Sequence, residues 1–342
     1  MLILGIESSC DETATTLLKT PNKILSQHIA SQDDVHAKFG GVVPELASRR
    51  HMETLMPLVT KVLCDTKISL DKIDGIAVTR APGLIGSILV GLSFAKALAY
   101  SLNKPIIGVN HLEGHLNAAF IEHADIPYPY IGLVVSGGHT SLYLVKDFGK
   151  YKLLGATRDD AAGEAFDKAA KILGLGYPGG PIIDKTARNG NPDAYKFTHP
   201  NISSGTNFDV AELDFSFSGI KTAVMLLCKR LGTQPYSKEV VSDVAASFQQ
   251  TIVDIIIKQM NKACEMNNCR TVIVSGGVAA NTCLRASLEK MCNKNMYQLF
   301  MPSLKLCTDN AAMIAYVGGK YLEMGKGDGM ELSAMANEEI GI

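Results

Sequence analysis

Apolar and polar positions follow two different periodicities along the first third of the chain. Short apolar runs typical of buried strands occur at residues 2–6, 13–18, 23–30, 73–79 and 105–109. Residues 44–63 and 83–102 carry longer patterns typical of helices, and the first has a proline in its first turn, where proline is tolerated. The predicted order is strand-strand-strand-helix-strand-helix-strand, which indicates an α/β fold.

A second unit is predicted to begin near residue 130. Residues 131–135 form an apolar run that meets Ser136-Gly137-Gly138-His139, and residues 140–145 return as a strand, so the glycine pair is expected at a hairpin. Residues 271–274 likewise meet Ser275-Gly276-Gly277. The repeated strand-Ser-Gly-Gly pattern hints at two related halves, and coincidence between two glycine turns is the alternative.

The rest of the chain divides by composition. Residues 189–214 are rich in Asn, Pro, Ser, Gly and Asp and are expected to form a loop-rich insertion. Residues 240–264 have the pattern of a long amphipathic helix. The polar, glycine-bearing tail after Gly325 is expected to be poorly ordered.

Composition limits the classes of protein that fit. With 342 residues the chain has room for two domains of about 150 residues each, and 46% hydrophobic with 20% charged residues is typical of a soluble globular protein. The formal net charge of -1 gives no overall basic surface for nucleic acid, so RNA contact must come from a local patch or a partner.

Nothing in the pattern suggests a membrane or secreted protein. No apolar run approaches the roughly 20 residues that a spanning helix needs, and the N-terminus has neither a secretory signal nor an organelle import leader. The 8 cysteines are scattered without a Cys-x-x-Cys pair, which is typical of reduced thiols in a cytoplasm. The expected location is therefore cytoplasmic.

The sharpest candidate site is the segment Asn110-His111-Leu112-Glu113-Gly114-His115. His111 and His115, four residues apart, share one face of a helix and can reach one metal ion, although a third ligand must come from elsewhere. The alternative is a pair of partly buried histidines hydrogen-bonded to the backbone. A zinc protease is disfavoured because Leu112 stands where its catalytic glutamate should be, and Glu113 faces away from that position.

Three further segments have both a functional and an ordinary structural interpretation. The glycines of Ser136-Gly137-Gly138 let backbone N–H groups approach an anion, but they also suit a tight turn. Asp167 and Lys168 could bind ribose hydroxyls and phosphate, or they could simply lie on a solvated helix face. The glycine-rich residues 176–181 that follow could let a flat ligand approach. Thr308 or Asp309 suits the cap of a helix running to Met324, while Asp309 also suits a triad of two histidines and one carboxylate with open metal positions.

Taken together, these segments closely resemble the universal tRNA N6-adenosine threonylcarbamoyltransferase family, in its bacterial branch. The matching runs span residues 5 to about 315 in the family's order, so the resemblance covers nearly the whole chain. They lie at residues 5–13, 40–49, 110–115, 135–140, 159–168, 177–181, 215–222, 275–281 and 307–315.

The resemblance implies an actin/sugar-kinase/heat-shock-ATPase-like α/β fold, with two ribonuclease-H-like lobes around a nucleotide cleft. The expected domains are an N-terminal lobe at residues 1–110 and a C-terminal lobe at 111–310 with a loop-rich helical insertion near 150–236. Residues 311–342 are expected to form a C-terminal helix and tail that pack back on the N-terminal lobe.

The resemblance also assigns site residues. It implies that His111, His115 and Asp309 bind one divalent metal per chain, with iron(II) or zinc favoured and magnesium a further candidate. Asp11 and Glu12 match the family's acidic pair, and one of them is expected to act as general base. The residues implied to contact substrate are Val135, Ser136, Gly137, Gly138, His139, Asp167, Gly180, Asp184 and Asn281.

The implied reaction moves a threonylcarbamoyl group from threonylcarbamoyl-adenylate to N6 of adenosine 37 in tRNAs that read codons beginning with A, and AMP leaves. The implied partners are tRNA, an inactive paralogue of the same fold and a small ATPase, with no membrane. The alternatives are a small-molecule kinase or ATPase of the same fold, a metallopeptidase and a non-catalytic nucleotide-binding scaffold. The kinase leaves the histidine pair without a role, and retention of both histidines with Asp11 and Glu12 argues against the scaffold.

Overall fold

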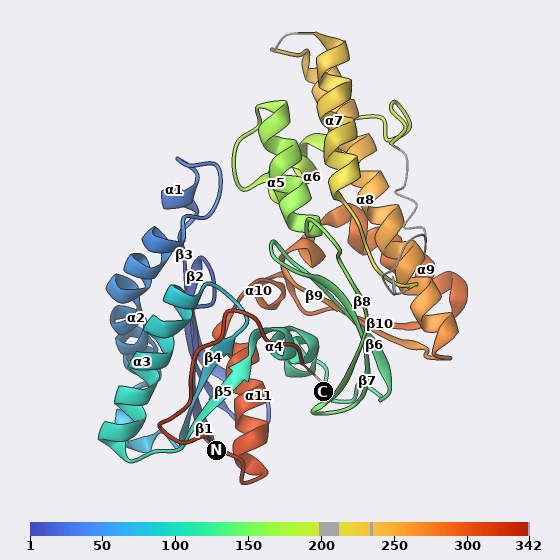
Figure 1. Ribbon diagram of the computed structural model, residues 1–342. Coiled ribbons are helices and arrows are strands. Elements are labelled where there is room, and N and C mark those ends of the chain that lie inside the picture. The colour runs from blue at the N-terminus through green and yellow to red at the C-terminus, as the bar shows by residue number, and fades with distance from the viewer. Residues whose placement is uncertain (198–211, 233–234, 341–342) are drawn as a thin grey trace. The chain divides into compact units, whose positions relative to one another are not determined.

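The computed structural model describes residues 1–197, 212–232 and 235–340. Its contacts divide the chain into two compact units, one made of Met1–Ile126 with Pro302–Ile340 and the other of Pro127–Met301. Each unit has its own five-stranded sheet (Figure 1). The unit boundary follows Ile126, whereas the sequence analysis placed it at residue 110, because the helix that begins at His111 packs within the first unit.

The first unit follows the order expected from its hydrophobic pattern. Its strands lie in the order β3-β2-β1-β4-β5, with the first three antiparallel and β1, β4 and β5 parallel to one another. Its elements are β1 (Leu2–Glu7), β2 (Glu12–Lys19), β3 (Lys23–Ser31), α1 (Asp33–His36), α2 (Pro44–Thr66), η1 (Leu70–Lys72), β4 (Gly75–Ala81), α3 (Ile85–Leu102), β5 (Ile106–Asn110), α4 (His111–Asn117), η2 (Ala118–Ile121), α10 (Leu304–Cys307) and α11 (Ala311–Glu323).

The sheet of this unit is buried on both faces. Leu4 and Ile6 of β1 belong to the hydrophobic core formed with α2 and α3. The intervening Gly5 faces α11 so closely that a Cβ there would lie 2.5 Å from the carbonyl oxygen of Ala311. Helices therefore cover both faces, which explains why the central strand reads as a continuous apolar run.

The second unit repeats the strand plan of the first. Its order is β10-β9-β6-β7-β8, with β6, β7 and β8 antiparallel and β6, β9 and β10 parallel. Its elements are β6 (Tyr130–Val135), β7 (Thr140–Asp147), β8 (Lys150–Ala156), α5 (Ala162–Leu173), α6 (Gly179–Ala187), α7 (Ser218–Leu231), α8 (Lys238–Met266), β9 (Thr271–Ser275), η3 (Gly277–Ala280), α9 (Thr282–Asn295) and β10 (Gln298–Phe300).

This shared plan corrects the meaning given to the repeated Ser-Gly-Gly pattern. β6 and β9 are neighbouring parallel strands of one sheet, with Val134 opposite Ser275, so both glycine turns lie at the same edge of one unit. By strand order β6 corresponds to β1, and the counterpart of the Ser136 turn is the turn that follows Glu7. The two halves are alike, but the repeated tripeptide does not mark them.

Two other expectations need correction. Residues 150–156, assigned to a loop-rich insertion, form β8 at the edge of the second sheet, and residues 198–211 of that insertion lie outside the described residues. The tail after Gly325 was expected to be poorly ordered. Instead Asp328 accepts a hydrogen bond from the backbone N–H of Gly108 at 2.7 Å, and Leu332 joins the core beside β4 and α3.

Two helices are long and apolar enough to meet the criterion for a membrane span, although the sequence analysis expected no such run. They are α3, with mean hydropathy 1.6, and α8, with mean hydropathy 1.4 over its most apolar 18 residues. Of those 18 residues of α8, 67% are buried, as in the core helix of a globular domain. Each helix packs against elements of its own unit.

Candidate metal centre

The two histidines lie on a short, fully buried helix at the carboxyl end of β5. The side chain of Asn110 begins α4 by accepting a hydrogen bond from the backbone N–H of Leu112 at 2.9 Å. His111 and His115 are one turn apart, with ring centroids 4.7 Å from each other and ring planes at 89°. The spacing in the sequence therefore brings both imidazoles to one face, as predicted.

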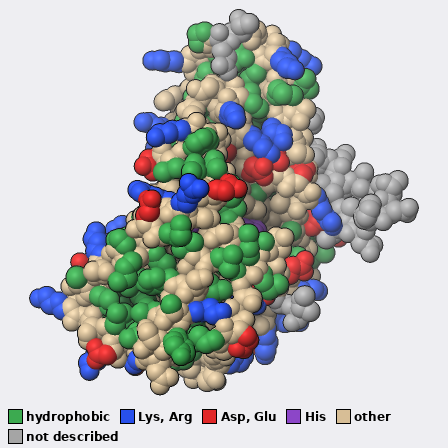
Figure 2. Space-filling view, turned by 60° about the vertical axis from the view of Figure 1, so that its left-hand side comes forward, with side chains coloured by type: hydrophobic (Ala, Val, Ile, Leu, Met, Phe, Trp, Pro, Cys, Tyr) green, Lys and Arg blue, Asp and Glu red, His purple; other side chains and the backbone are tan. Residues whose placement is uncertain are grey.

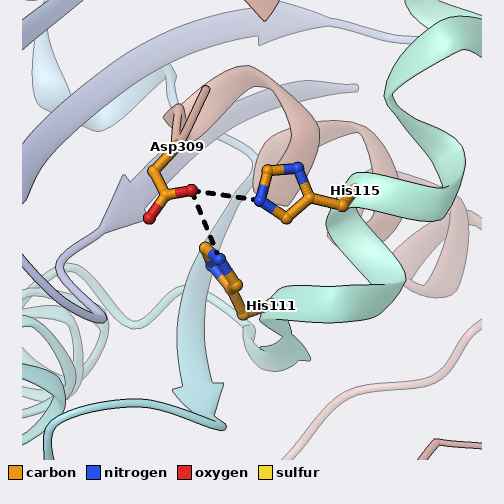
Figure 3. Close-up of side chains that lie close together, drawn as sticks. All are labelled: His111, His115 and Asp309. Atoms are coloured by element: carbon orange, nitrogen blue, oxygen red, sulfur yellow. Dashed lines mark hydrogen bonds and ion pairs between the residues drawn. The ribbon is translucent and has the colours of Figure 1, made fainter. Parts of the chain in front are cut away.

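Asp309 reaches the same place from the turn before α11. The cap of that helix is Asn310, whose side chain accepts from the backbone N–H of Met313 at 3.1 Å and donates to the carbonyl of Thr308 at 2.8 Å. The prediction that Thr308 or Asp309 caps the helix is wrong. Because Asn310 performs this role, the carboxylate of Asp309 is free to face the imidazoles (Figure 3).

The three side chains have the geometry of a metal site. Oδ1 of Asp309 lies 3.0 Å from Nε2 of His115 and 3.4 Å from Nε2 of His111. Metal–ligand bonds of about 2.0–2.2 Å at tetrahedral or octahedral angles separate neighbouring ligand atoms by about 3.0–3.5 Å. The cluster therefore has the spacing and the donor atoms to hold one divalent ion, and both histidines present the same ring nitrogen to it.

Close packing of α4 against α11 makes this convergence possible. A Cβ on Gly114 would lie 3.0 Å from Cγ of Met313 and 3.1 Å from Cδ1 of Ile314. A larger side chain at Gly114 would require the side chains of Met313 and Ile314 to shift. Gly114, which lies between the two histidines in the sequence, thus marks the close contact between α4 and α11.

The charged groups of the cluster shift one another's pKa values. Burial opposes ionisation of Asp309, but the positive charge of His111 and hydrogen bonds from both imidazoles outweigh it and hold the pKa of Asp309 well below its usual value. Burial lowers the pKa of His111, but the carboxylates of Asp309 and Glu7 raise it well above its usual value. Burial also lowers the pKa of His115, and the hydrogen bond to Asp309 does not fully offset it. The pocket thus favours positive charge between its carboxylates.

Glu7 belongs to this cluster, and the sequence analysis gave it no role. It is the last residue of β1, it has no exposed surface, and its Oε2 lies 3.0 Å from Nδ1 of His111. Burial raises its pKa, but the charge of His111 and hydrogen bonds from His111 and Thr79 leave it below the usual value. The signal in the sequence was a lone acidic residue closing a continuous apolar strand.

The acidic pair lies in the same unit, at the start of β2. Glu12 opens the strand, and burial together with the negative charges of Asp309 and Asp11 raises its pKa well above the usual value. The preceding turn is held by His51 of α2, a residue that sequence analysis also missed. Nε2 of His51 donates to the carbonyl of Cys10 at 2.9 Å, and Nδ1 accepts from the hydroxyl of Thr13 at 2.8 Å.

The glycine turn after β6 is open on one side. The backbone N–H of Ser136 donates to the carbonyl of His139 at 2.8 Å, and the Ser136 hydroxyl accepts from the N–H of His139 at 3.1 Å. Gly137 and Gly138 are exposed, and a Cβ on either would meet nothing within 4 Å. Space for a ligand therefore exists beside both glycines.

Several substrate-binding candidates of the second unit are already engaged within the protein. The carboxylate of Asp167 accepts from the N–H of Gly179 at 2.7 Å, and that of Asp184 accepts from the hydroxyl of Thr282 at 2.8 Å. Asn281 caps α9 and donates to Gln249 at 2.7 Å. A Cβ on Gly180, by contrast, would meet nothing within 4 Å.

Direct contacts link these candidates into one region. A Cβ on Gly163, at the start of α5, would lie 2.7 Å from the carbonyl oxygen of Ser136, and one on Gly276 would lie 2.3 Å from that of Val135. α5 carries Asp167, which holds the start of α6 and hence Gly180. Lys168 of the same helix pairs with Asp160 and Glu164, each at 2.7 Å, which raises its pKa.

Comparison with known proteins decides the family. A family model described as tRNA N6-adenosine threonylcarbamoyltransferase (TsaD) matches residues 23–316. A curated protein of that name from Clostridium kluyveri is 49% identical over 99% of this chain and 98% of its own length. The chain belongs to the tRNA N6-adenosine threonylcarbamoyltransferase family. A relative of the same name from Syntrophus aciditrophicus is 48% identical over 98% of this chain and 97% of its own length.

Solved structures confirm the expected fold class. Full-length HypF in a phosphate- and nucleotide-bound form matches with a TM-score of 0.60 at 15% identity, over 94% of this chain and 56% of that one. Component A of the (R)-2-hydroxyglutaryl-CoA dehydratase of Acidaminococcus fermentans matches with a TM-score of 0.53 at 14% identity, over 95% of this chain and all of that one. Family membership favours the transferase over the kinase and metallopeptidase alternatives.

Proposed function

We propose that this chain transfers the threonylcarbamoyl group of threonylcarbamoyl-adenylate to N6 of adenosine 37 in tRNAs that read codons beginning with A, with release of AMP. The observation that carries the proposal is the convergence of His111, His115 and Asp309 in a chain 49% identical to a curated transferase of this name. A small-molecule kinase of the same fold gives no use to two imidazoles facing one carboxylate.

The chemistry needs positioning more than a strong nucleophile. The lone pair of the adenine N6 amine is shared with the ring, so rate must come from orientation of the two substrates and from stabilisation of developing charge. A ligand set of two imidazoles and one carboxylate suits iron(II) or zinc, with magnesium a further candidate. When bound, such an ion supplies Lewis acidity and a template for the oxygens of the donor.

Glu12 is the proposed general base. A carboxylate with a raised pKa is a stronger proton acceptor than an ordinary one, and burial beside two other carboxylates raises that of Glu12. Asp11 is the neighbouring alternative, and His51 holds the turn that carries both.

The second unit is proposed to bind the donor. The N–H groups of Gly137 and Gly138 would stabilise the developing oxyanion, in keeping with the open space beside them. Val135, Ser136 and His139 complete this turn along the phosphate and acyl part of the donor. The ribose and adenosine contacts are assigned to Asp167, Gly180, Asp184 and Asn281.

The proposed setting is the cytoplasm, where the chain works with tRNA, an inactive paralogue of its own fold and a small ATPase. A net charge of -1 favours tRNA binding by this chain together with its partners, and all eight cysteines are free, as in a reducing compartment.

Figure 2 views the side of α2 and α3 and shows hydrophobic side chains gathered there. Met52, Met56, Ile85 and Leu89 of these helices are each between 46% and 64% exposed, which is typical of a protein-binding surface.

Reconstitution tests the proposed activity. The purified chain, its partners, the donor and an unmodified tRNA are combined, and the nucleosides are analysed by mass spectrometry. We expect threonylcarbamoyladenosine and AMP to form together, and H115A to abolish both. Release of phosphate from ATP with sugars or acetate, with no modified nucleoside, would instead support the kinase.

A further inference from the structure

Glu7 is a buried carboxylate whose hydrogen bonds come from three directions. The backbone N–H of Ser9 donates to Oε1 at 2.5 Å, and the hydroxyl of Thr79 donates to Oε2 at 2.6 Å. Nδ1 of His111 lies 3.0 Å from the same Oε2. A buried carboxylate is tolerated only when it is paired and hydrogen-bonded, so these contacts fix its position at the end of β1.

The strand plan explains why these groups meet. β1 and β4 are parallel neighbours with Ile6 opposite Val78, so Glu7 and Thr79 both lie at the carboxyl edge of the sheet. β5, the next parallel strand, ends at Asn110, and His111 follows directly. Glu7 therefore contacts the metal-ligand helix from the sheet, on the side of the ring away from Asp309.

The contact with Glu7 keeps a hydrogen on Nδ1 of His111. A carboxylate only accepts hydrogen bonds, so the ring nitrogen that faces it must be the one that donates. The hydroxyl of Ser9, 3.2 Å from the same Nδ1, can then serve only as a second acceptor. Nε2 faces Asp309 at 3.4 Å and likewise donates to that carboxylate while no ion is present. A divalent ion would replace the hydrogen on Nε2, whereas Glu7 keeps the hydrogen on Nδ1.

We infer that Glu7 is a positioning residue for the metal centre, which holds His111 in the one ring orientation and tautomer that present Nε2 to a divalent ion. The inference rests on the proposed metal site and adds a residue to it. A carboxylate behind a ligating imidazole also makes the ligand more basic, and loss of such a partner typically costs 10- to 100-fold in metal affinity.

The second histidine lacks this support. Nδ1 of His115 is buried and has no hydrogen-bond partner among the described residues. The two histidines are therefore held differently, because only His111 has a carboxylate behind its ring at Nδ1. Substitution of Glu7 should weaken the bond from His111 and leave the position of His115 unchanged.

E7Q is the informative substitution because it keeps the size of the side chain. If the new amide nitrogen takes the place of Oε2, it donates to Nδ1 of His111 and forces the hydrogen onto Nε2, which then cannot bind metal. If the amide is turned over, its NH2 group faces the N–H of Ser9, and two donors oppose each other. Both orientations weaken the site.

The matched control is E113Q. Glu113 is also buried, lies on α4 between the two ligands, and accepts a hydrogen bond from the hydroxyl of Tyr321 at 2.6 Å. E113Q removes a buried carboxylate from the ligand helix without touching the hydrogen bond behind His111. E7D keeps the charge on a shorter side chain and should retain part of the affinity.

The test measures Kd for zinc and cobalt(II) on the full chain by competition with a chromophoric chelator, with folding of each metal-free variant checked by circular dichroism. We expect E7Q to raise Kd about 10- to 100-fold and to change the visible spectrum of bound cobalt, with E7D intermediate and E113Q unchanged. Wild-type affinity in E7Q, or an equal loss in E113Q, overturns the role of Glu7. A wild-type chain that binds zinc no better than H115A overturns the metal site itself.

Discussion

Oδ1 of Asp309 lies 3.0 Å from Nε2 of His115, although the two residues are separated by 194 positions in the chain. At this contact α4 packs closely against α11 at Gly114, and Asn310 caps α11 in place of Asp309. The contact joins a ligand pair formed by local helix geometry to a third ligand that only the tertiary fold supplies.

The first prediction concerns removal of metal. Chelation should abolish transfer in the reconstituted system, and iron(II) or zinc should restore it to the wild type but not to H115A or D309A. Because the ion binds only the folded state, saturation at about 100 times Kd should stabilise the protein by about 2.7 kcal/mol. Thermal unfolding with and without metal measures this, and an equal metal-dependent rise in D309A would contradict the site.

The second prediction concerns Asn310, which caps α11 beside the proposed metal ligand Asp309. N310A and N281A each remove an asparagine that accepts a hydrogen bond at the start of a helix. Each should therefore lower the free energy of unfolding by about 0.5–2 kcal/mol. Only N310A should also raise Kd for zinc, because only its cap adjoins a metal ligand. Equal zinc affinity in the two variants would show that Asp309 is held by other contacts.

The third prediction concerns pH. Only an ionised carboxylate accepts a proton, so the single-turnover rate should fall as pH drops through the pKa of Glu12. Burial and two neighbouring carboxylates raise that pKa, so this acid limb should lie above the value of about 4.3 for a free glutamate. E12Q should lower the rate about 10²- to 10⁴-fold and remove the limb. Persistence of the limb in E12Q would exclude Glu12 as the base.

The fourth prediction compares two glycines of the second unit. In G163A the new Cβ would lie 2.7 Å from the carbonyl oxygen of Ser136. Crowding of backbone should cost about 1–3 kcal/mol, more than the gain of up to about 1 kcal/mol in helix propensity. In G137A the Cβ meets nothing within 4 Å, so stability should be unchanged while transfer slows. Thermal unfolding and single-turnover rates measure both effects, and the reverse order of stability would refute the packing argument.

Much of the fold was predictable because it follows from local pattern. The apolar runs gave the strand and helix order of the first unit, and the spacing of His111 and His115 gave their shared face. Local sequence left Asp309 either as a helix cap or as the carboxylate of a metal triad, and the family resemblance favoured the triad. The capping preference of Asn310 is equally strong, and nothing short-range decides between adjacent capping residues.

The remaining errors share one physical cause. Ser136 and Ser275 looked like markers of two halves, but strand pairing, which no local pattern reveals, makes β6 and β9 neighbours in one sheet. Leu332 lay in a polar tail whose composition suggested disorder, yet a single apolar side chain can dock on a core formed by distant strands. Glu7 had no neighbour in sequence that indicated its partner, because His111 comes from a different strand end.

The order of the chain has a consequence for biosynthesis. The first unit is completed by Pro302–Ile340, which a ribosome makes only after the whole of Pro127–Met301. When the strands of the first sheet have left the ribosome, Asp309 and α11 have not yet been made. The face of the sheet that α11 covers is then exposed, and only the two imidazoles of the proposed metal site are present. The proposed metal site is therefore complete only after Asp309 has been synthesised, and a product that ends before Asp309 would lack the third ligand.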